Sequence, residues 1–279
     1  MTLCIAALCE GGRTLVMAAD SMASLGFVCA ELDIHKVRRI HRNWWVMIAG
    51  DDIVPVFDIL EWTKKQLHEE SEHTYEEVSG ALLVNYQRKR LTLAEQAVLL
   101  PRGISLSEFR NNGVNLLPRE TFARLDNAVQ NFEFPLKLLL GGFDREGNGY
   151  IASVHEPGYL ERHDIPGFHA IGNGQYGALY MMYYRKMSVS MSLLDCLYYT
   201  YEANRYGYEA GGIGNKTEIY ILRHNSEIQL LNEAAVESLD EIWSEVKPKE
   251  PERLDRVSPF LEEMEKQETS IDVDVSIEN

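Results

Sequence analysis

The fold is decided by residues 2–20, which read TLCIAALCEGGRTLVMAAD. Two apolar runs, 3–9 and 14–19, are separated by Glu10, two glycines and Arg13, a combination that is typical of a turn. Because apolar residues do not alternate with polar ones in either run, the pattern predicts a hairpin whose strands are buried on both faces. We therefore expect the chain to begin with a buried pair of strands.

Beyond the hairpin, the pattern predicts strands, two helices, strands, two helices and strands again. Antiparallel sheets with helix pairs on their outer faces satisfy this order, so we expect an α+β fold, a four-layer α/β/β/α sandwich. The predicted strands cover 44–49, 136–140, 150–154, 168–171, 218–222 and 228–231. The predicted helices cover 53–67, 176–187 and 192–205, and another runs from a capping box at 74–77 toward 100.

The length of 279 residues is compatible with one hydrophobic core, and the hydrophobic content of 45% is that of a globular protein. We expect one domain over 1–246 with an insertion at about 101–135, where glycines and prolines separate short helical patterns. Prolines and acidic residues are frequent over 247–279, so this segment is predicted to be a mobile acidic tail.

The formal net charge of −16 repels phosphate backbones and anionic lipid, which disfavours nucleic-acid and membrane partners. No apolar run has the roughly 18 residues of a membrane span, and no basic segment precedes the first apolar run, so we expect a cytoplasmic protein. The four cysteines lack Cys-x-x-Cys spacing and are interpreted as buried free thiols. No metal-ligand cluster is evident among the cysteines and eight histidines, so no metal or organic cofactor is predicted.

Thr2 is a candidate nucleophile. Methionine aminopeptidase removes Met1 when the next side chain is small, which leaves Thr2 with a free amine. An α-amine has a pKa of about 8 and can act as the general base for the hydroxyl of the same residue. On its own, a threonine in the second position is more often without function.

Three further residues strengthen this hypothesis. Asp20 ends a predicted buried strand, and Lys36 follows it after a short interval. A lysine that is paired to a carboxylate keeps its charge, lowers the pKa of a nearby amine and favours an alkoxide, although an ordinary salt bridge is the commoner interpretation. Gly50, at the end of a strand, offers a backbone N–H for an oxyanion, or simply a turn.

These residues belong to a longer ordered set, which comprises Thr2, AADS at 18–21, Lys36, AGD at 49–51, LGGFDREG at 140–147, IGNG at 171–174 and AGG at 210–212. In this order the segments resemble those of proteasome β-type subunits of the bacterial kind, within the N-terminal nucleophile hydrolases. The resemblance covers about residues 2–222. It implies the four-layer fold and a threonine hydrolase that cleaves amide bonds of a peptide or protein substrate through an ester on Thr2, without a cofactor.

The resemblance also implies roles for individual residues. Asp20 and Lys36 would form the charge network of Thr2, and Gly50 would donate to the oxyanion. Ile48 and, less directly, Met22 would line the pocket for the substrate side chain that precedes the scissile bond. A homo-oligomer is implied as well, because members of this family confine their sites within assemblies.

Three departures from the family pattern leave alternatives open. The hairpin is two residues longer than usual, so an ungapped count back from Asp20 reaches Cys4, which becomes a rival nucleophile if the bond before it is cleaved. Asn173 stands in place of the usual serine and Gly207 in place of an acidic residue, for which Glu209 is a substitute. The insertion and the acidic tail would alter any ring contacts. The alternative functions are a catalytically silent scaffold subunit and a small-molecule amidase or acylase on the same fold.

Overall fold

A computed structural model describes residues 2–20, 22–25, 28–31, 35–50, 52–68, 71–208 and 216–247. The chain divides into two compact units, Met1–Leu239 and Asp240–Asn279, and only residues 240–247 of the second are described. The acidic tail predicted over 247–279 lies outside the described residues, except for its first residue.

The first sheet contains the N-terminal hairpin at its centre. Its strands β1 (Leu3–Cys9) and β2 (Thr14–Asp20) are buried along their whole length, as predicted. Glu10, Gly11 and Gly12 turn the chain between them with positive φ angles, which glycine adopts without steric cost. The sheet is antiparallel in the order β10-β1-β2-β11-β12, and its other strands are β10 (Phe168–Gly172), β11 (Thr217–Arg223) and β12 (Gln229–Leu230).

The second sheet is also antiparallel, in the order β5-β6-β7-β8-β9. Its strands are β5 (Val37–His41), β6 (Trp44–Gly50), β7 (Leu136–Phe143), β8 (Gly149–His155) and β9 (Tyr159–Arg162). The two edge strands, β5 and β9, were not predicted. A separate two-stranded sheet, β3 (Met22–Leu25) with β4 (Val28–Glu31), was not predicted either.

The two sheets pack face to face around a shared apolar core. Met17 of the first sheet and Leu139 of the second belong to this core, and both are fully buried. The sheets approach closely at Gly141 of β7, where an added Cβ would lie 2.5 Å from the methyl group of Met17. Glycine at this position therefore permits the contact between the sheets.

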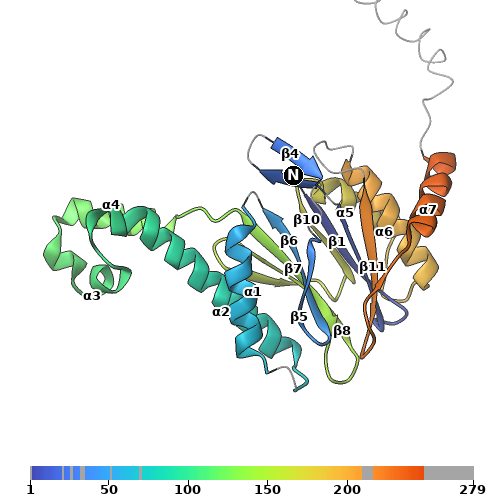
Figure 1. Ribbon diagram of the computed structural model, residues 1–279, viewed down its shortest axis with the longest axis horizontal. Helices are drawn as coiled ribbons and strands as arrows, with labels where there is room; N and C mark the ends of the chain where they lie inside the picture. The colour runs from blue at the N-terminus through green and yellow to red at the C-terminus, as the bar shows by residue number, and fades with distance from the viewer. Residues whose placement is uncertain are drawn as a thin grey trace, which may run out of the picture. The chain divides into compact units, whose positions relative to one another are not determined.

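Helices cover the outer faces of both sheets (Figure 1). Helices α1 (Val54–Gln66) and α2 (Tyr75–Ala94) bury their apolar faces against the second sheet in a second core that includes Ile59 and Leu82. Helices α5 (Gln175–Tyr184) and α6 (Leu193–Tyr208) pack against β1, β2 and β10 of the first sheet. The predicted α+β class with two antiparallel sheets is therefore confirmed.

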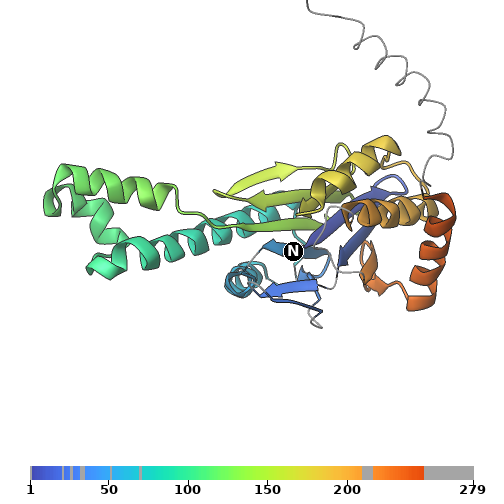
Figure 2. The same ribbon diagram turned by 90° about the horizontal axis from the view of Figure 1, so that it is seen from above.

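The helical boundaries differ from the prediction after α2. This helix opens with the predicted capping box between Thr74 and Glu77 but ends at Ala94, and a π-helical turn, η1 (Glu95–Leu99), and a 3₁₀ turn, η2 (Leu100–Arg102), follow. The predicted insertion forms helices α3 (Leu106–Leu116) and α4 (Arg119–Gln130), which extend beyond the end of α2, away from the sheets (Figures 1 and 2). Phe109 and Leu125 give these helices a small core of their own with η1.

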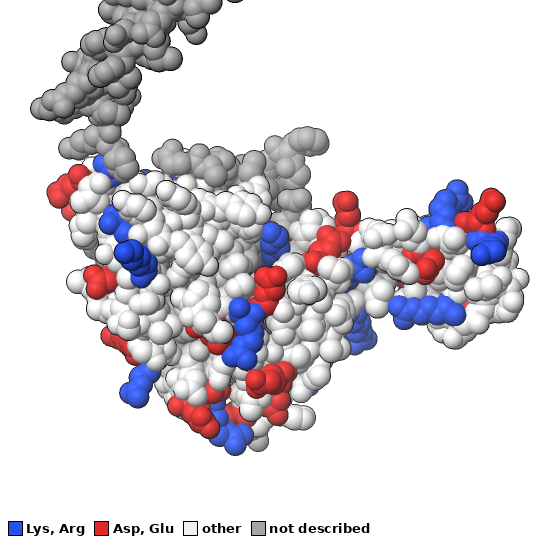
Figure 3. All heavy atoms as spheres, turned by 180° about the vertical axis from the view of Figure 1, so that it is seen from behind, with Lys and Arg blue, Asp and Glu red and all other residues white. Residues whose placement is uncertain are grey.

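Two surface properties bear on the expected partners. On the face drawn in Figure 3, acidic and basic side chains are interspersed, and no broad basic area is visible. Among the described residues no helix is long and apolar enough to cross a membrane. The last described helix, α7 (Glu233–Val246), was not predicted, although its apolar residues recur at helical spacing.

Candidate active site

Thr2 lies immediately before β1, at the edge where β10 pairs with that strand. Its side chain is buried, and its carbonyl oxygen accepts a hydrogen bond of 2.9 Å from the backbone N–H of Asn173. Gly172 pairs with Leu3 at a φ of +102°, and an added Cβ would lie only 2.0 Å from the Thr2 oxygen. The IGNG segment therefore holds the start of the chain through a glycine that no other residue can replace without displacing Thr2.

Asp20 and Lys36 form a buried ion pair next to Thr2. The carboxylate at the end of β2 is fully buried, and its Oδ1 accepts from the Lys36 Nζ at 2.7 Å. The same oxygen accepts the backbone N–H of Leu3 at 2.8 Å. The structure thus brings the predicted charge network to the residue after Thr2. Within the described residues it records no direct hydrogen bond between Lys36 and Thr2.

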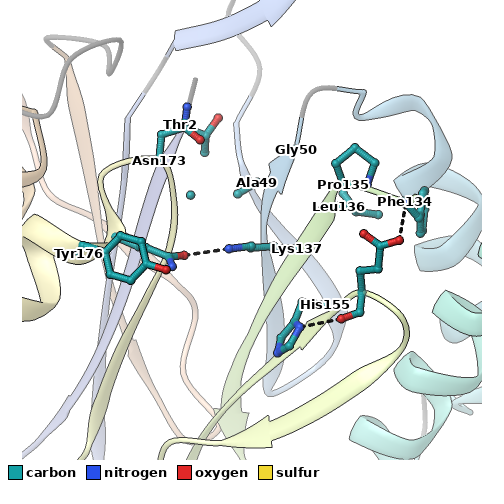
Figure 4. A pocket seen from close by; sticks show the side chains of 13 residues that line it. Thr2, Ala49, Gly50, Phe134, Pro135, Leu136, Lys137, His155, Asn173 and Tyr176 are labelled. Carbon is teal, nitrogen blue, oxygen red and sulfur yellow. Dashed lines mark hydrogen bonds between the residues drawn. The ribbon is translucent and has the colours of Figure 1, made fainter. Parts of the chain in front are cut away.

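Gly50 ends β6 beside Thr2. A Cβ at this position would lie 2.9 Å from the carbonyl oxygen of Pro135, so a side chain would have to displace the backbone that precedes β7. Thr2, Gly50 and Asn173 all line one cavity (Figure 4). Three of the five predicted catalytic residues therefore share a cavity, and the remaining two form the ion pair behind it.

This cavity has a volume of about 700 Å³, enough for several amino-acid residues. It lies between the end of β6, the start of β7, the turn after β8 and the first turn of α5. Its lining residues are Thr2, Ala49, Gly50, Phe134, Pro135, Leu136, Lys137, His155, Glu156, Gly172, Asn173, Gln175 and Tyr176.

The floor of the cavity carries polar residues that the sequence analysis did not identify. The Nζ of Lys137 donates to Oε1 of Gln175 at 3.0 Å across the cavity (Figure 4). The carboxylate of Glu156 accepts the backbone N–H of Phe134 at 2.8 Å, and a hydrogen bond of 3.0 Å joins the Nδ1 of His155 to the Glu156 carbonyl oxygen. Of these residues, Lys137 could have been identified from the sequence, because it is the one charged residue within the apolar segment of β7.

The remaining predicted residues lie elsewhere. The Ile48 side chain is buried in the core beneath α1 and does not line this cavity. The side chain of Met22 and the whole of Glu209 lie outside the described residues. At Gly207 of α6 an added Cβ would lie 2.4 Å from the Leu3 side chain and 3.0 Å from the Gly174 carbonyl oxygen, so a larger residue would require Leu3 to shift.

Cys4, the rival nucleophile, is completely buried in the core between the sheets. Its thiol lies 3.5 Å from the carbonyl oxygen of Ile48, to which it donates. Burial raises the pKa of the Cys4 thiol to about 12, so the reactive thiolate is disfavoured at neutral pH. In this arrangement Cys4 packs as a small apolar residue.

His163 and His169 form a stacked pair outside the residues that line the cavity. The rings of His163 and His169 stack with their centroids 3.5 Å apart, and a hydrogen bond of 2.9 Å joins Nε2 of His163 to the Ser153 hydroxyl. Burial, reinforced by the charges of His163 and Lys137, lowers the pKa of His169 to about 3. Burial also lowers the pKa of His163. The pair is therefore neutral in the folded protein at neutral pH.

We expect this pair to make the protein less stable in mild acid. The folded-state pKa of His169 lies below the value of about 6.5 for an unfolded chain, so the unfolded state binds more protons as the pH falls below about 6.5. Stability should be complete above that pH and should decrease toward pH 3. In His169→Gln, the loss of unfolding free energy between about pH 7.5 and about pH 5 should be smaller than in the wild type by about 1–2 kcal/mol. Urea unfolding at both pH values measures this difference. The matched control is the exposed His68→Gln, and equal losses in His169→Gln and the wild type would contradict the prediction.

The chain was compared with protein-family models and with curated proteins, and neither comparison found a match. The geometry of the site and the resemblance of its segments are therefore the basis for a functional conclusion.

Proposed function

We propose that this protein is a threonine hydrolase of the proteasome-like, N-terminal nucleophile kind, which cleaves amide bonds of peptide or protein substrates. Thr2 is the nucleophile once Met1 has been removed. Homo-oligomerisation is part of the proposal and follows from the family resemblance.

In the proposed reaction, the amine of Thr2 accepts the proton of its own hydroxyl while Oγ1 attacks the carbonyl carbon of the substrate. The N–H of Gly50 stabilises the negative oxygen of the tetrahedral intermediate. The C–N bond breaks, the leaving amine takes the proton, and an ester remains on Thr2. A water molecule then attacks the ester, which releases the acid and restores the Thr2 hydroxyl.

The buried ion pair of Asp20 and Lys36 next to Thr2 is the observation that carries the proposal. Burying an ion pair costs desolvation energy, so it is weak evidence for stability alone. Here one carboxylate oxygen joins the lysine to the backbone N–H of Leu3, directly after the nucleophile. The positive charge of Lys36 then favours an unprotonated amine and an ionised hydroxyl at Thr2. The adjacent cavity provides space for the substrate.

One observation favours a second candidate, a catalytically silent scaffold on the same fold. Gly207, which aligns with the family's acidic residue, has no side chain that could support the Thr2 amine, and an added Cβ would lie 2.4 Å from the Leu3 side chain. Asn173, in place of the family's serine, is exposed at the cavity and contacts Thr2 through its backbone N–H. A scaffold would not react with electrophiles.

The intact mass of the purified protein, measured before and after treatment with a peptide epoxyketone or vinyl sulfone, tests the proposal. We expect the mass without Met1 and one adduct per chain, located on Thr2 by peptide mapping. Active protein that retains Met1 would overturn the Thr2 mechanism, and an adduct on Cys4 would move the nucleophile there. Protein without Met1 that never forms an adduct and hydrolyses no peptide would support the scaffold.

A further inference from the structure

Lys137 presents its positive charge to the cavity beside Thr2, and among the described residues no ion pair with it is recorded. Its side chain is only partly exposed, and its hydrogen-bond partner within the described residues is the neutral amide of Gln175. Other lysines that are largely buried pair with carboxylates, as Lys36 does with Asp20 and Lys89 with Asp58. In a chain of formal charge −16, an unpaired lysine that faces a cavity favours an anionic ligand.

The other groups that line the cavity do not neutralise the positive charge of Lys137. Glu156 is the one carboxylate among the lining residues, and its Oε1 accepts the Phe134 N–H. Within the part of the chain that the structure describes, no ion pair is recorded between Glu156 and Lys137. Helix α5 begins at Gln175 with Gly174 at its N-cap and no side-chain cap, so the positive end of the helix adjoins the cavity. A carboxylate that replaced the Gln175 oxygen as the acceptor would place a full negative charge opposite the ammonium group, which adds Coulomb attraction to the hydrogen bond.

The position of the cavity relative to β6 indicates which part of a substrate enters it. Side chains alternate along the strand, so Ile48 faces the core beneath α1, whereas Ala49 faces the other sheet. Lys137 pairs with Ala49 across the two strands and therefore lies on the same face, opposite Ile48. If the side chain that precedes the scissile bond binds on the Ile48 side, as the family resemblance implies, the part of the cavity that Ala49 and Lys137 line receives the leaving group.

We propose that the part of the cavity lined by Ala49 and Lys137 binds the leaving-group side of the substrate and that Lys137 selects for a carboxylate there. The carboxylate has two possible sources. It is either an acidic side chain directly after the scissile bond or the free carboxylate of a leaving group of one residue. This inference rests on the proposed function, because that function defines the leaving-group side.

Matched peptides test both sources. Four substrates share one acyl side and end, after the scissile bond, in glutamate amide, glutamine amide, free alanine or alanine amide. We expect kcat/KM to be at least about tenfold higher for a carboxylate than for its neutral partner, which corresponds to one charge-assisted hydrogen bond. The glutamate pair reports the side-chain source and the alanine pair the terminal source.

Variants assign the preference to Lys137. In Lys137→Gln the preference for a carboxylate over its neutral partner should disappear, and Lys137→Glu should favour a lysine amide instead. The matched control is Lys65→Gln, which removes an exposed lysine from α1 and should keep the preference. Hydrolysis with equal kcat/KM for carboxylate and neutral partners would overturn the inference and leave the proposed function intact.

Binding provides a readout that does not depend on hydrolysis. Glutamate amide, glutamine amide, free alanine and alanine amide are titrated into full-length protein, and the side-chain amide resonances of Gln175 are followed by NMR. We expect a carboxylate probe to shift these resonances and to bind at least about tenfold more weakly to Lys137→Gln. Such binding without hydrolysis or labelling would support the carboxylate subsite and overturn the proposed function. Equal shifts with all four probes would overturn the subsite.

Discussion

Thr2→Ala should lower kcat/KM for peptide hydrolysis by at least about 10³-fold, because the substitution removes the group that forms the covalent intermediate. Alanine is small enough for methionine aminopeptidase to remove Met1, so the variant should also begin at residue 2. The backbone contacts of Thr2 with Asn173 do not depend on its side chain. The loss should therefore appear in activity and in labelling by the electrophile, with little change in stability.

Thr2→Ser is the matched control for the hydroxyl. It keeps an oxygen nucleophile next to the amine and should retain labelling. Cys4→Ala should also retain labelling, because the Cys4 thiol is fully buried and its pKa is raised to about 12. Full activity in Thr2→Ala, or loss of labelling in Cys4→Ala alone, would contradict the assignment of Thr2 as the nucleophile.

The sequence predicts the central elements of the fold better than its edges. Strands β1 and β2 are buried on both faces, so their residues are almost uniformly apolar and the pattern is unambiguous. Strand β9, in contrast, has the sequence Tyr-Leu-Glu-Arg and is mostly exposed. Strand β5 contains two arginines and a histidine. Edge strands like these gain their structure by pairing with a neighbour, and that pairing leaves no clear period in a short polar segment.

The candidate site was predictable where its residues belong to ordered motifs and not where tertiary contacts create it. Thr2, Asp20 and Lys36 were identified from their order, and the structure places Asp20 between Lys36 and the N–H of Leu3. Lys137 and Gln175 come from a strand and a helix that are far apart in the sequence. Their contact depends on how β7 and α5 meet at the cavity, which no local pattern records.

Asp20→Asn should lower the free energy of unfolding by about 3–5 kcal/mol, because it leaves the buried ammonium group of Lys36 without a counter-ion. The side chains of Lys36 and Asp20 are 8% and 0% exposed, so water cannot solvate the unpaired ammonium group of Lys36 in the variant. The Oδ1 of asparagine can still accept the N–H of Leu3, so the substitution removes mainly the charge. Urea unfolding measures the loss, and the rate of electrophile labelling should fall as well, since the network that favours the Thr2 alkoxide is broken.

The double variant Asp20→Asn with Lys36→Met distinguishes the effect of the whole ion pair on stability from the effect of one unpaired charge. Removing both charges should restore the free energy of unfolding to within about 1–2 kcal/mol of the wild type, because a buried pair often has little net effect on stability, whereas an unpaired buried charge is costly. Labelling should stay slow in the double variant, since stability returns and the positive charge does not. Glu61→Gln, which breaks an exposed pair with Lys65, should change stability by less than about 0.5 kcal/mol. Additive losses in the double variant, or a loss in Asp20→Asn no larger than in Glu61→Gln, would show that the two buried charges do not depend on each other.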